Sequence, residues 1–160
     1  MKVLFKRLHP DAIIPTYAHE GDSGFDFYSI ENSLVIPGEV IQIKTGLSVD
    51  LPSPLLIKSL NSTQSISVTF ELQIRPKSGR ALKEGLTIVN TPGTIDNGYK
   101  GQIIILMTSI KKSVFIPKGE KIAQGVILPV FSAPYIDIQE TSDVGVSSRG
   151  AGGFGSSGLN

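Results

Sequence analysis

The sequence contains no cysteine, which excludes disulfide bonds, thiolate nucleophiles and cysteine metal ligands. Its only two histidines, His9 and His19, lack partners at metal-ligand spacing, so no zinc site is expected. No run approaches the roughly 18 apolar residues of a membrane helix. Residues 1–10 carry basic side chains instead of the apolar centre of a signal peptide. We therefore expect a cytoplasmic protein without a membrane partner.

A strong charge of either sign is also missing. The chain has 15 Lys and Arg against 14 Asp and Glu, a formal net charge of +1 at pH 7. A broad nucleic-acid surface needs a basic excess, so nucleic acid is not an expected partner, although a local cluster can still bind a small anion. With 160 residues, of which 40% are hydrophobic, the chain can build one core but hardly two.

The spacing of glycine and proline predicts an all-β fold. The 17 glycines and 10 prolines divide the chain into short runs of β-forming residues. Residues 66–74 alternate between apolar and polar, which predicts a strand with one buried face. A helical turn or two is expected only at Ser78–Glu84. Strands are expected at residues 2–8, 33–36, 40–43, 47–51, 65–74, 86–89, 102–108 and 123–130.

A tight turn is predicted at Asn97-Gly98, between two β-like flanks. In a type I′ hairpin both turn residues need positive φ, and Asn-Gly is the pair most typical of it. Asp96 and Tyr99 would then face each other, with a carboxylate and an aromatic ring on one face of the hairpin. Alternatively, Asp96 only tolerates the turn and Tyr99 only packs nearby.

Two further segments could bind phosphate. Residues 75–80 hold three cations and a serine around a turn, a group that can bind phosphate oxygens or can simply be a solvated basic loop. Gln124 interrupts an otherwise apolar run, where a lone glutamine is usually a satisfied polar group. The Gly- and Ser-rich residues 145–158 have the composition of a flexible tail, yet they contain Arg149 and Phe154. Their GxGxxG pattern follows no βαβ strand and does not predict a dinucleotide site.

Taken in order, these segments resemble the five motifs of the trimeric dUTPase family. The motifs correspond to Ala18–Phe27, Pro76–Gly79, Asn90–Gly101, Ile122–Gln124 and Arg149–Gly158. The resemblance spans nearly the whole chain. It implies a jelly-roll-like β-barrel, three copies of which form a homotrimer with active sites shared between subunits. It also implies magnesium-dependent hydrolysis of dUTP to dUMP and pyrophosphate.

The resemblance also divides the chain into two parts and gives roles to individual residues. Residues 1–144 would form the barrel, with an insertion at about residues 53–69, and residues 145–160 a flexible arm that closes the active site. Asp96 would be the general base that activates water. The uracil and deoxyribose pocket would be formed by Asn90, Thr94, Ile95, Asp96, Tyr99 and Ile104. The phosphates would be bound by Lys77, Ser78, Gly79, Gln124, Arg149, Ser156 and Ser157, and Gly155 would also bind the substrate.

Two more roles follow from the resemblance. Phe154 would stack on the uracil ring. Mg²⁺ would be coordinated mainly by phosphate oxygens and water, with Asp26 touching it only through a bound water.

The sequence departs from the family in several places. Lys77 stands where the family usually has Arg, and a point charge does not replace a fork of fixed donors. Further departures are Arg80 and Gly125, where apolar residues are usual, Gln102 for Glu, and Ser157 for Thr.

Two rival interpretations stay open. One is a protein of dUTPase fold that binds a protein partner through the insertion and the tail. The other is the related dCTP deaminase, although the Asn90–Tyr99 segment and the last motif favour the pyrophosphatase.

Overall fold

The computed structural model describes residues 1–58, 65–131 and 136–152. These residues form strands in four antiparallel sheets around one core, together with a short helix α1 (Ser78–Glu84), so the prediction of an all-β fold with one helical segment is confirmed. The strands are β1 (Leu4–Arg7), β2 (Phe25–Tyr28), β3 (Ser33–Val35), β4 (Ile41–Lys44), β5 (Leu47–Asp50), β6 (Leu55–Lys58), β7 (Ser65–Arg75), β8 (Leu86–Ile88), β9 (Gly93–Ile95), β10 (Ile104–Ser109), β11 (Val114–Ile116) and β12 (Lys121–Val130).

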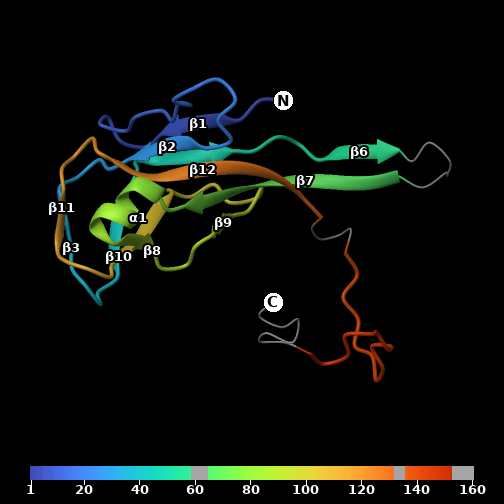
Figure 1. Cartoon of the computed structure of the whole chain (residues 1–160). Helices are drawn as coiled ribbons and strands as arrows, with labels where there is room; N and C mark the ends of the chain where they lie inside the picture. Colours follow the sequence, from blue (N-terminus) through green and yellow to red (C-terminus); the bar gives the residue numbers. More distant parts are fainter. Residues whose placement is uncertain (59–64, 132–135, 153–160) are drawn as a thin grey trace.

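The largest sheet contains the segments that matter for the site. Its strand order is β2-β12-β7-β6, and β9 pairs with β7 as well. Figure 1 shows β12 and β7 crossing the molecule side by side, and their register pairs Gln124 with Arg75. The smaller sheets are β1-β5, β4-β10-β8 and β11-β3. Fully buried side chains such as Phe27, Leu72 and Ile122 fill the space between the sheets.

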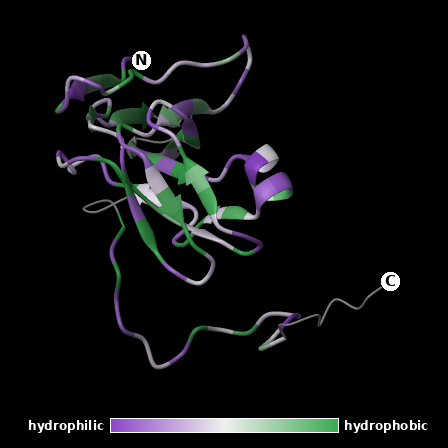
Figure 2. Cartoon of the chain, turned by 90° about the vertical axis from the view of Figure 1, so that its left-hand side faces the viewer, coloured by the Kyte–Doolittle hydropathy of each residue, from purple (hydrophilic) through white to green (hydrophobic). Residues whose placement is uncertain are grey.

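Helix α1 lies on the surface and buries none of its residues, and Figure 2 shows it as mostly hydrophilic. It ends at Gly85, whose φ of 75° is accessible to glycine at little cost. The guanidinium of Arg80 lies 2.7 Å from Glu84 Oε2 and 2.7 Å from Glu120 Oε1. This polar network explains the arginine at position 80, because it joins the helix to the loop before β12. No helix within the described residues is long and apolar enough to cross a membrane.

The glycine at position 125 also has a structural reason. A Cβ there would lie 2.6 Å from ring carbons of both Phe25 and Phe27, and 2.9 Å from Leu72 Cδ1. The two aromatic rings of β2 therefore take the space that a larger side chain on β12 would need.

A hairpin extends from the largest sheet in the region predicted to hold an insertion. β6 pairs with the first part of β7, from Leu55 opposite Val68 to Lys58 opposite Ser65. The pairing forms a β-hairpin, and β7 is 11 residues long. Figure 1 shows the hairpin reaching beyond the rest of the β-rich body. That it is an insertion relative to the family stays a prediction.

The prediction that β7 has one buried face holds over only part of the strand. From Phe70 to Ile74 the apolar residues are buried and the polar residues between them are half-buried. Ser67 and Thr69, predicted to face solvent, are buried as well, with 3% and 6% of their surface exposed. Both faces of β7 are therefore covered at this end, and period-two alternation does not predict that.

Candidate functional site

Three predicted site residues meet around one polar cavity of about 270 Å³. Asp26 comes from β2, Gln124 from β12, and Lys77 from the residues between β7 and α1. In the sheet Gln124 lies opposite Asp26 on one side and opposite Arg75 on the other, which brings Lys77 to the same end of the sheet. We call this hollow the Asp26 cavity; its lining is Ala18, Asp22, Ser23, Gly24, Asp26, Lys77 and Gln124.

The amide of Gln124 is held by one hydrogen bond and lies close to the backbone of Gly24. Its Nε2 donates a hydrogen bond of 2.9 Å to the carbonyl oxygen of Pro76. A Cβ on residue 24 would lie only 2.6 Å from its Oε1, so Gly24 is needed for this close approach. Gln124 thus connects β12 with the segment that carries Lys77.

The carboxylate of Asp26 is shared by two lysines. Lys77 Nζ donates to Oδ1, and Lys121 Nζ lies 2.7 Å from Oδ2. Burial by itself raises the pKa of Asp26, but the hydrogen bonds from Lys121 and Lys77 outweigh it and hold the pKa below its usual range. The hydrogen bond to Asp26 raises the pKa of Lys121.

These shifts stabilise the folded protein over a wide pH window. The lowered pKa of Asp26 contributes stability above about pH 4, and this contribution is lost as the pH falls through the folded-state pKa. The raised pKa of Lys121 contributes stability below about pH 10, and it is lost as the pH rises through the folded-state pKa.

We predict that Asp26→Asn lowers the free energy of unfolding at pH 7, because it leaves Lys77 and Lys121 without their shared counter-ion. The difference from the wild type should shrink as the pH falls below about 4, where Asp26 becomes protonated first in the unfolded chain and then, at lower pH, in the folded protein. Urea unfolding of both proteins at pH 7 and at a pH below about 4 measures the difference in the free energy of unfolding. Asp11→Asn is the matched control, since it breaks the more exposed pair with Lys118 and should change stability less. An Asp26→Asn effect of equal size at both pH values would contradict the prediction.

Lys121 is the residue that sequence reasoning missed. It is three positions before Gln124, and in a regular strand such residues point to opposite faces. The ladder between β12 and β2 shifts register between Lys121 and Ala123, a β-bulge that changes this alternation. The only signal in the sequence was that Ile122 and Ala123, two adjacent residues, are both apolar, and both are buried.

A second group of predicted residues lies on the segment from Asn90 to Ile104. The turn predicted at Asn97-Gly98 is present, closed by a 3.0 Å bond from the Tyr99 N–H to the Asp96 carbonyl oxygen. The predicted type I′ geometry is wrong, because Gly98 does not have positive φ. The predicted hairpin is wrong too: β9 pairs with β7 and not with the chain after the turn, so the turn need not match the twist of a hairpin.

The side chains of this second group form an accessible surface. Asn90, Thr94, Asp96 and Tyr99 are exposed, Ile104 is 37% exposed, and Ile95 is half-buried against the core. The ring of Tyr99 folds over Gly101, where a Cβ would lie 2.6 Å from its Cζ. Its hydroxyl donates a hydrogen bond of 2.9 Å to the carbonyl oxygen of Gln102.

The two groups lie far apart within one copy of the chain. Ile95, at the end of β9, lies opposite Leu72 of β7, and the antiparallel pairing sends Asp96 away from the end of β7 that leads to Lys77. The register places Asp96 level with Glu71, and Lys77 follows six residues later, just beyond the end of β7, so the two lie roughly 20 Å apart at about 3.3 Å per residue. The Asp26 cavity contains neither Asp96 nor Tyr99 in its lining.

The remaining predicted residues lie at α1 and in the C-terminal segment. Ser78 and Gly79 are exposed at the start of α1, where the first N–H groups have no partner within a helix. Arg149 lies on an exposed segment and its Nε donates 2.8 Å to the carbonyl oxygen of Gly152. Phe154, Gly155, Ser156 and Ser157 lie outside the described residues.

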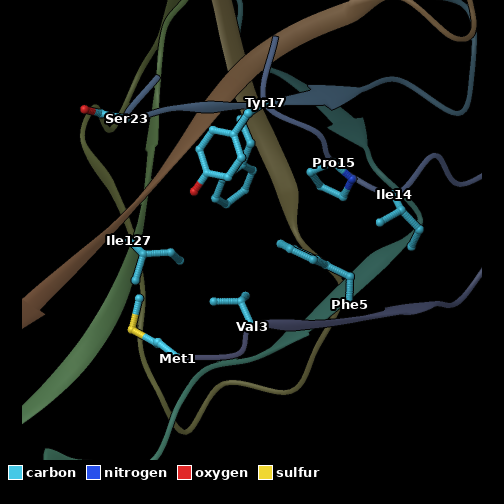
Figure 3. A pocket seen from close by; sticks show the side chains of 9 residues that line it. Met1, Val3, Phe5, Ile14, Pro15, Tyr17, Ser23 and Ile127 are labelled. Atoms are coloured by element: carbon cyan, nitrogen blue, oxygen red, sulfur yellow. The ribbon is translucent and has the colours of Figure 1, made fainter. Parts of the chain in front are cut away.

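A larger hollow, of about 440 Å³, is apolar. Figure 3 shows Met1, Val3, Phe5 and Tyr17 around it, with Ile127 of β12 at one side. It offers few polar groups, so it does not suit a polyphosphate. Of these two hollows, the Asp26 cavity is the one with a cationic side chain, Lys77, in its lining, so it is the better candidate for a phosphate.

The described residues contain no group of three or more His, Asp or Glu side chains that could enclose a metal ion. Mg²⁺ does not require one, because it keeps several waters and binds through one or two carboxylates together with substrate phosphates. Asp26 has an ionised carboxylate with about four acceptor sites, of which the lysines use two. The residues present therefore fit a magnesium ion that arrives with a phosphate ligand.

The fold and the site define an antiparallel β-sheet protein with a polar cavity in which Lys77 and Asp26 meet. The model of the dUTPase family matches residues 10–158. The deoxyuridine 5'-triphosphate nucleotidohydrolase of Clostridioides difficile is 44% identical over 155 residues, with 96% of each chain covered. That of Nautilia profundicola is 43% identical over 159 residues, with 99% of each covered.

Solved structures agree with these relatives. The dUTPase of Staphylococcus bacteriophage 80alpha with dUPNHPP has a TM-score of 0.77 and 27% identity, covering 99% of both chains. The chain belongs to the dUTPase family. It is a dUTP diphosphatase, and the jelly-roll-like fold that the resemblance implied is confirmed.

Proposed function

We propose that the protein hydrolyses dUTP to dUMP and pyrophosphate with magnesium, in active sites shared between the copies of a homotrimer. The observation that carries the proposal is the separation of Asp96 and Tyr99 from the Asp26 cavity within one copy. A general base must come within hydrogen-bond reach of the water that it activates. Because the substrate is a free nucleotide, the proposal places the enzyme in the cytoplasm.

A site shared between two copies explains how the two separated groups can act on one substrate. The phosphates of dUTP would lie at Lys77 and Gln124 of one copy, and Asp96 of a second copy would approach the α-phosphorus. Closed symmetric oligomers repeat such an interface at every subunit, so a ring of three copies would contain three complete sites. Each copy would then supply its two groups to different sites.

The phosphate chain would be held at the end of β7 and the start of α1. Lys77 has three donors and uses one on Asp26, which leaves others for phosphate oxygens. The exposed N–H groups at Ser78 and Gly79 would add hydrogen bonds, together with the Ser78 hydroxyl and Gln124. Lysine at position 77 gives a point charge and not a bidentate fork, so the neighbouring donors must orient the phosphate.

Asp96 would accept a proton from the attacking water. The water oxygen forms a bond to the α-phosphorus, and the bond from that phosphorus to the bridging oxygen breaks, so pyrophosphate leaves and dUMP remains. An exposed carboxylate suits this role because a substrate water can reach it. Cations around the phosphates stabilise the charge that moves onto the leaving group.

The segment around Asp96 would recognise the nucleoside. Asn90 and backbone groups of Thr94 and Ile95 would pair with the uracil edge, and cytosine presents a donor where uracil presents an acceptor. Tyr99 would pack against the deoxyribose and exclude a 2′-hydroxyl. Ile104, at the start of β10, is accessible to line the same pocket.

The C-terminal residues 145–160 would close over the bound nucleotide. Phe154 would stack on uracil, Arg149, Ser156 and Ser157 would reach the phosphates, and Gly155 would allow the close approach of this segment to the substrate. Closure removes bulk water and strengthens the charged contacts. Arg149 is exposed and does not line the Asp26 cavity of its own copy, so it is free to bind the phosphates in the active site of another copy.

Asp26 would hold a water of the magnesium ion while it keeps Lys77 and Lys121 in place. When bound, the ion would neutralise phosphate charge and orient the phosphate oxygens. The side chains in the cavity would orient the nucleotide and exclude competing water.

The test is pyrophosphate release by the purified protein with magnesium and dUTP, dCTP, dTTP or UTP. We expect kcat/KM for dUTP to exceed that for each other nucleotide at least about a hundredfold, because wrong nucleotides leave buried polar groups unpaired. Conversion of dCTP to a uracil nucleotide would indicate the deaminase instead. Binding of dUTP without cleavage would favour the binding-protein interpretation.

A further inference from the structure

Asn97 connects the turn that carries Asp96 to the base of the β6–β7 hairpin. Its side-chain Nδ2 donates 2.9 Å to the carbonyl oxygen of Pro52 and 3.4 Å to that of Phe70. We infer that Asn97 is a positioning residue for Asp96, an inference that rests on the proposed function.

The two carbonyl groups that Asn97 reaches lie at a break in the sheet. Along this edge β7 pairs with β9 at Leu72–Ile74 and with β6 at Ser65–Val68. Phe70 lies between the two ladders. The amide of Asn97 therefore supplies, from a side chain, a hydrogen bond that neither neighbouring strand provides there.

The backbone of the same turn is held from the other side. Lys100 Nζ donates 3.0 Å to the carbonyl oxygen of Asn97 and 2.5 Å to Asp50 Oδ1 at the end of β5. The Tyr99 N–H closes the turn on the Asp96 carbonyl oxygen. The turn is thus attached to Asp50 of β5, to Pro52 two residues further on, and to Phe70 of β7.

Asp96 depends on this attachment for its position. Its side chain is exposed and forms no ion pair with any described residue. The direction of the carboxylate is then set by the backbone of the turn, and a displacement of about 1 Å of a reacting group can cost about a hundredfold in rate. Asn97 acts through Asp96 and does not itself need to touch the nucleotide.

The experiment compares Asn97→Ala and Asn97→Leu with the wild type, and the leucine variant keeps the size of the side chain but removes its donors. We expect kcat for dUTP to fall at least about tenfold, while the Kd of dUpNHpp changes less than about threefold. Asn32→Ala is the matched control, because Asn32 Oδ1 also bonds a backbone group, the Lys118 N–H at 2.9 Å, in another part of the molecule. It should leave kcat unchanged.

An unchanged kcat in both Asn97 variants would overturn the inference. The inference would also be overturned if the Asn97 variants lost dUpNHpp affinity by the same factor as kcat and had a lower Tm, because these changes would show a general structural role. Asp96→Asn, measured alongside, separates the two proposals. If that variant is as active as the wild type, the proposed general base is wrong; if it is inactive and the Asn97 variants are fully active, only the positioning role is wrong.

Discussion

Asp96→Asn is expected to lower kcat for dUTP by about a thousandfold while the protein still binds dUpNHpp. The amide has nearly the shape of the carboxylate but cannot accept the proton of the attacking water, and general-base catalysis contributes about a hundredfold to ten-thousandfold. Asp96 is exposed and forms no ion pair within the described part of the chain, so the change should not unfold the protein. Steady-state pyrophosphate release and calorimetric binding measure the two effects separately.

The control for this variant is Asp11→Asn. Asp11 is also on the surface and is paired with Lys118 at 2.6 Å, so the substitution makes the same change of charge away from both groups of site residues. We expect it to keep full activity. An Asp96→Asn enzyme that retains more than about a tenth of the wild-type kcat would show that another group activates the water.

The sequence predicted the strands well where they are long or alternate clearly. The residues of β7 and β12 and the short helix at Ser78–Glu84 were expected close to their observed bounds. β2, β6, β9 and β11 were not among the expected strands, because each is short and because buried Asp26 hides the apolar pattern of β2.

The prediction of a hairpin at Asn97-Gly98 was wrong for a physical reason. Local sequence favours a type I′ turn, but the chain before the turn finds its partner in β7, about 20 residues earlier in the sequence. Tertiary pairing thus overrides the local preference. The amide of Asn97 then takes a role that turn statistics do not predict, since its partners Pro52 and Phe70 are distant in the sequence.

The site could be predicted from the sequence only in part. Asp26, Lys77 and Gln124 do meet around one cavity, as the ordered motifs implied. The place of Lys121 depends on a β-bulge, which depends in turn on cross-strand pairing and leaves little trace in the sequence. The distance of Asp96 from Lys77 follows from the register of β9 on β7, so it could be seen only in the structure.

A mixing experiment tests the shared active site most directly. One variant carries Asp96→Asn; the other carries Lys77→Ala and Ser78→Ala. Each alone should be nearly inactive, because every site would lack either the base or the phosphate-binding group.

Hydrolysis of dUTP is then measured after the two variants are unfolded together and refolded as a mixture. If each site takes Asp96 from one copy and Lys77 from another, random assembly gives about a quarter of the sites both intact groups, and activity should return to about a quarter of the wild type. If the mixture contains mixed oligomers but stays as inactive as its components, each site lies within a single copy, and the proposal of a shared active site is wrong.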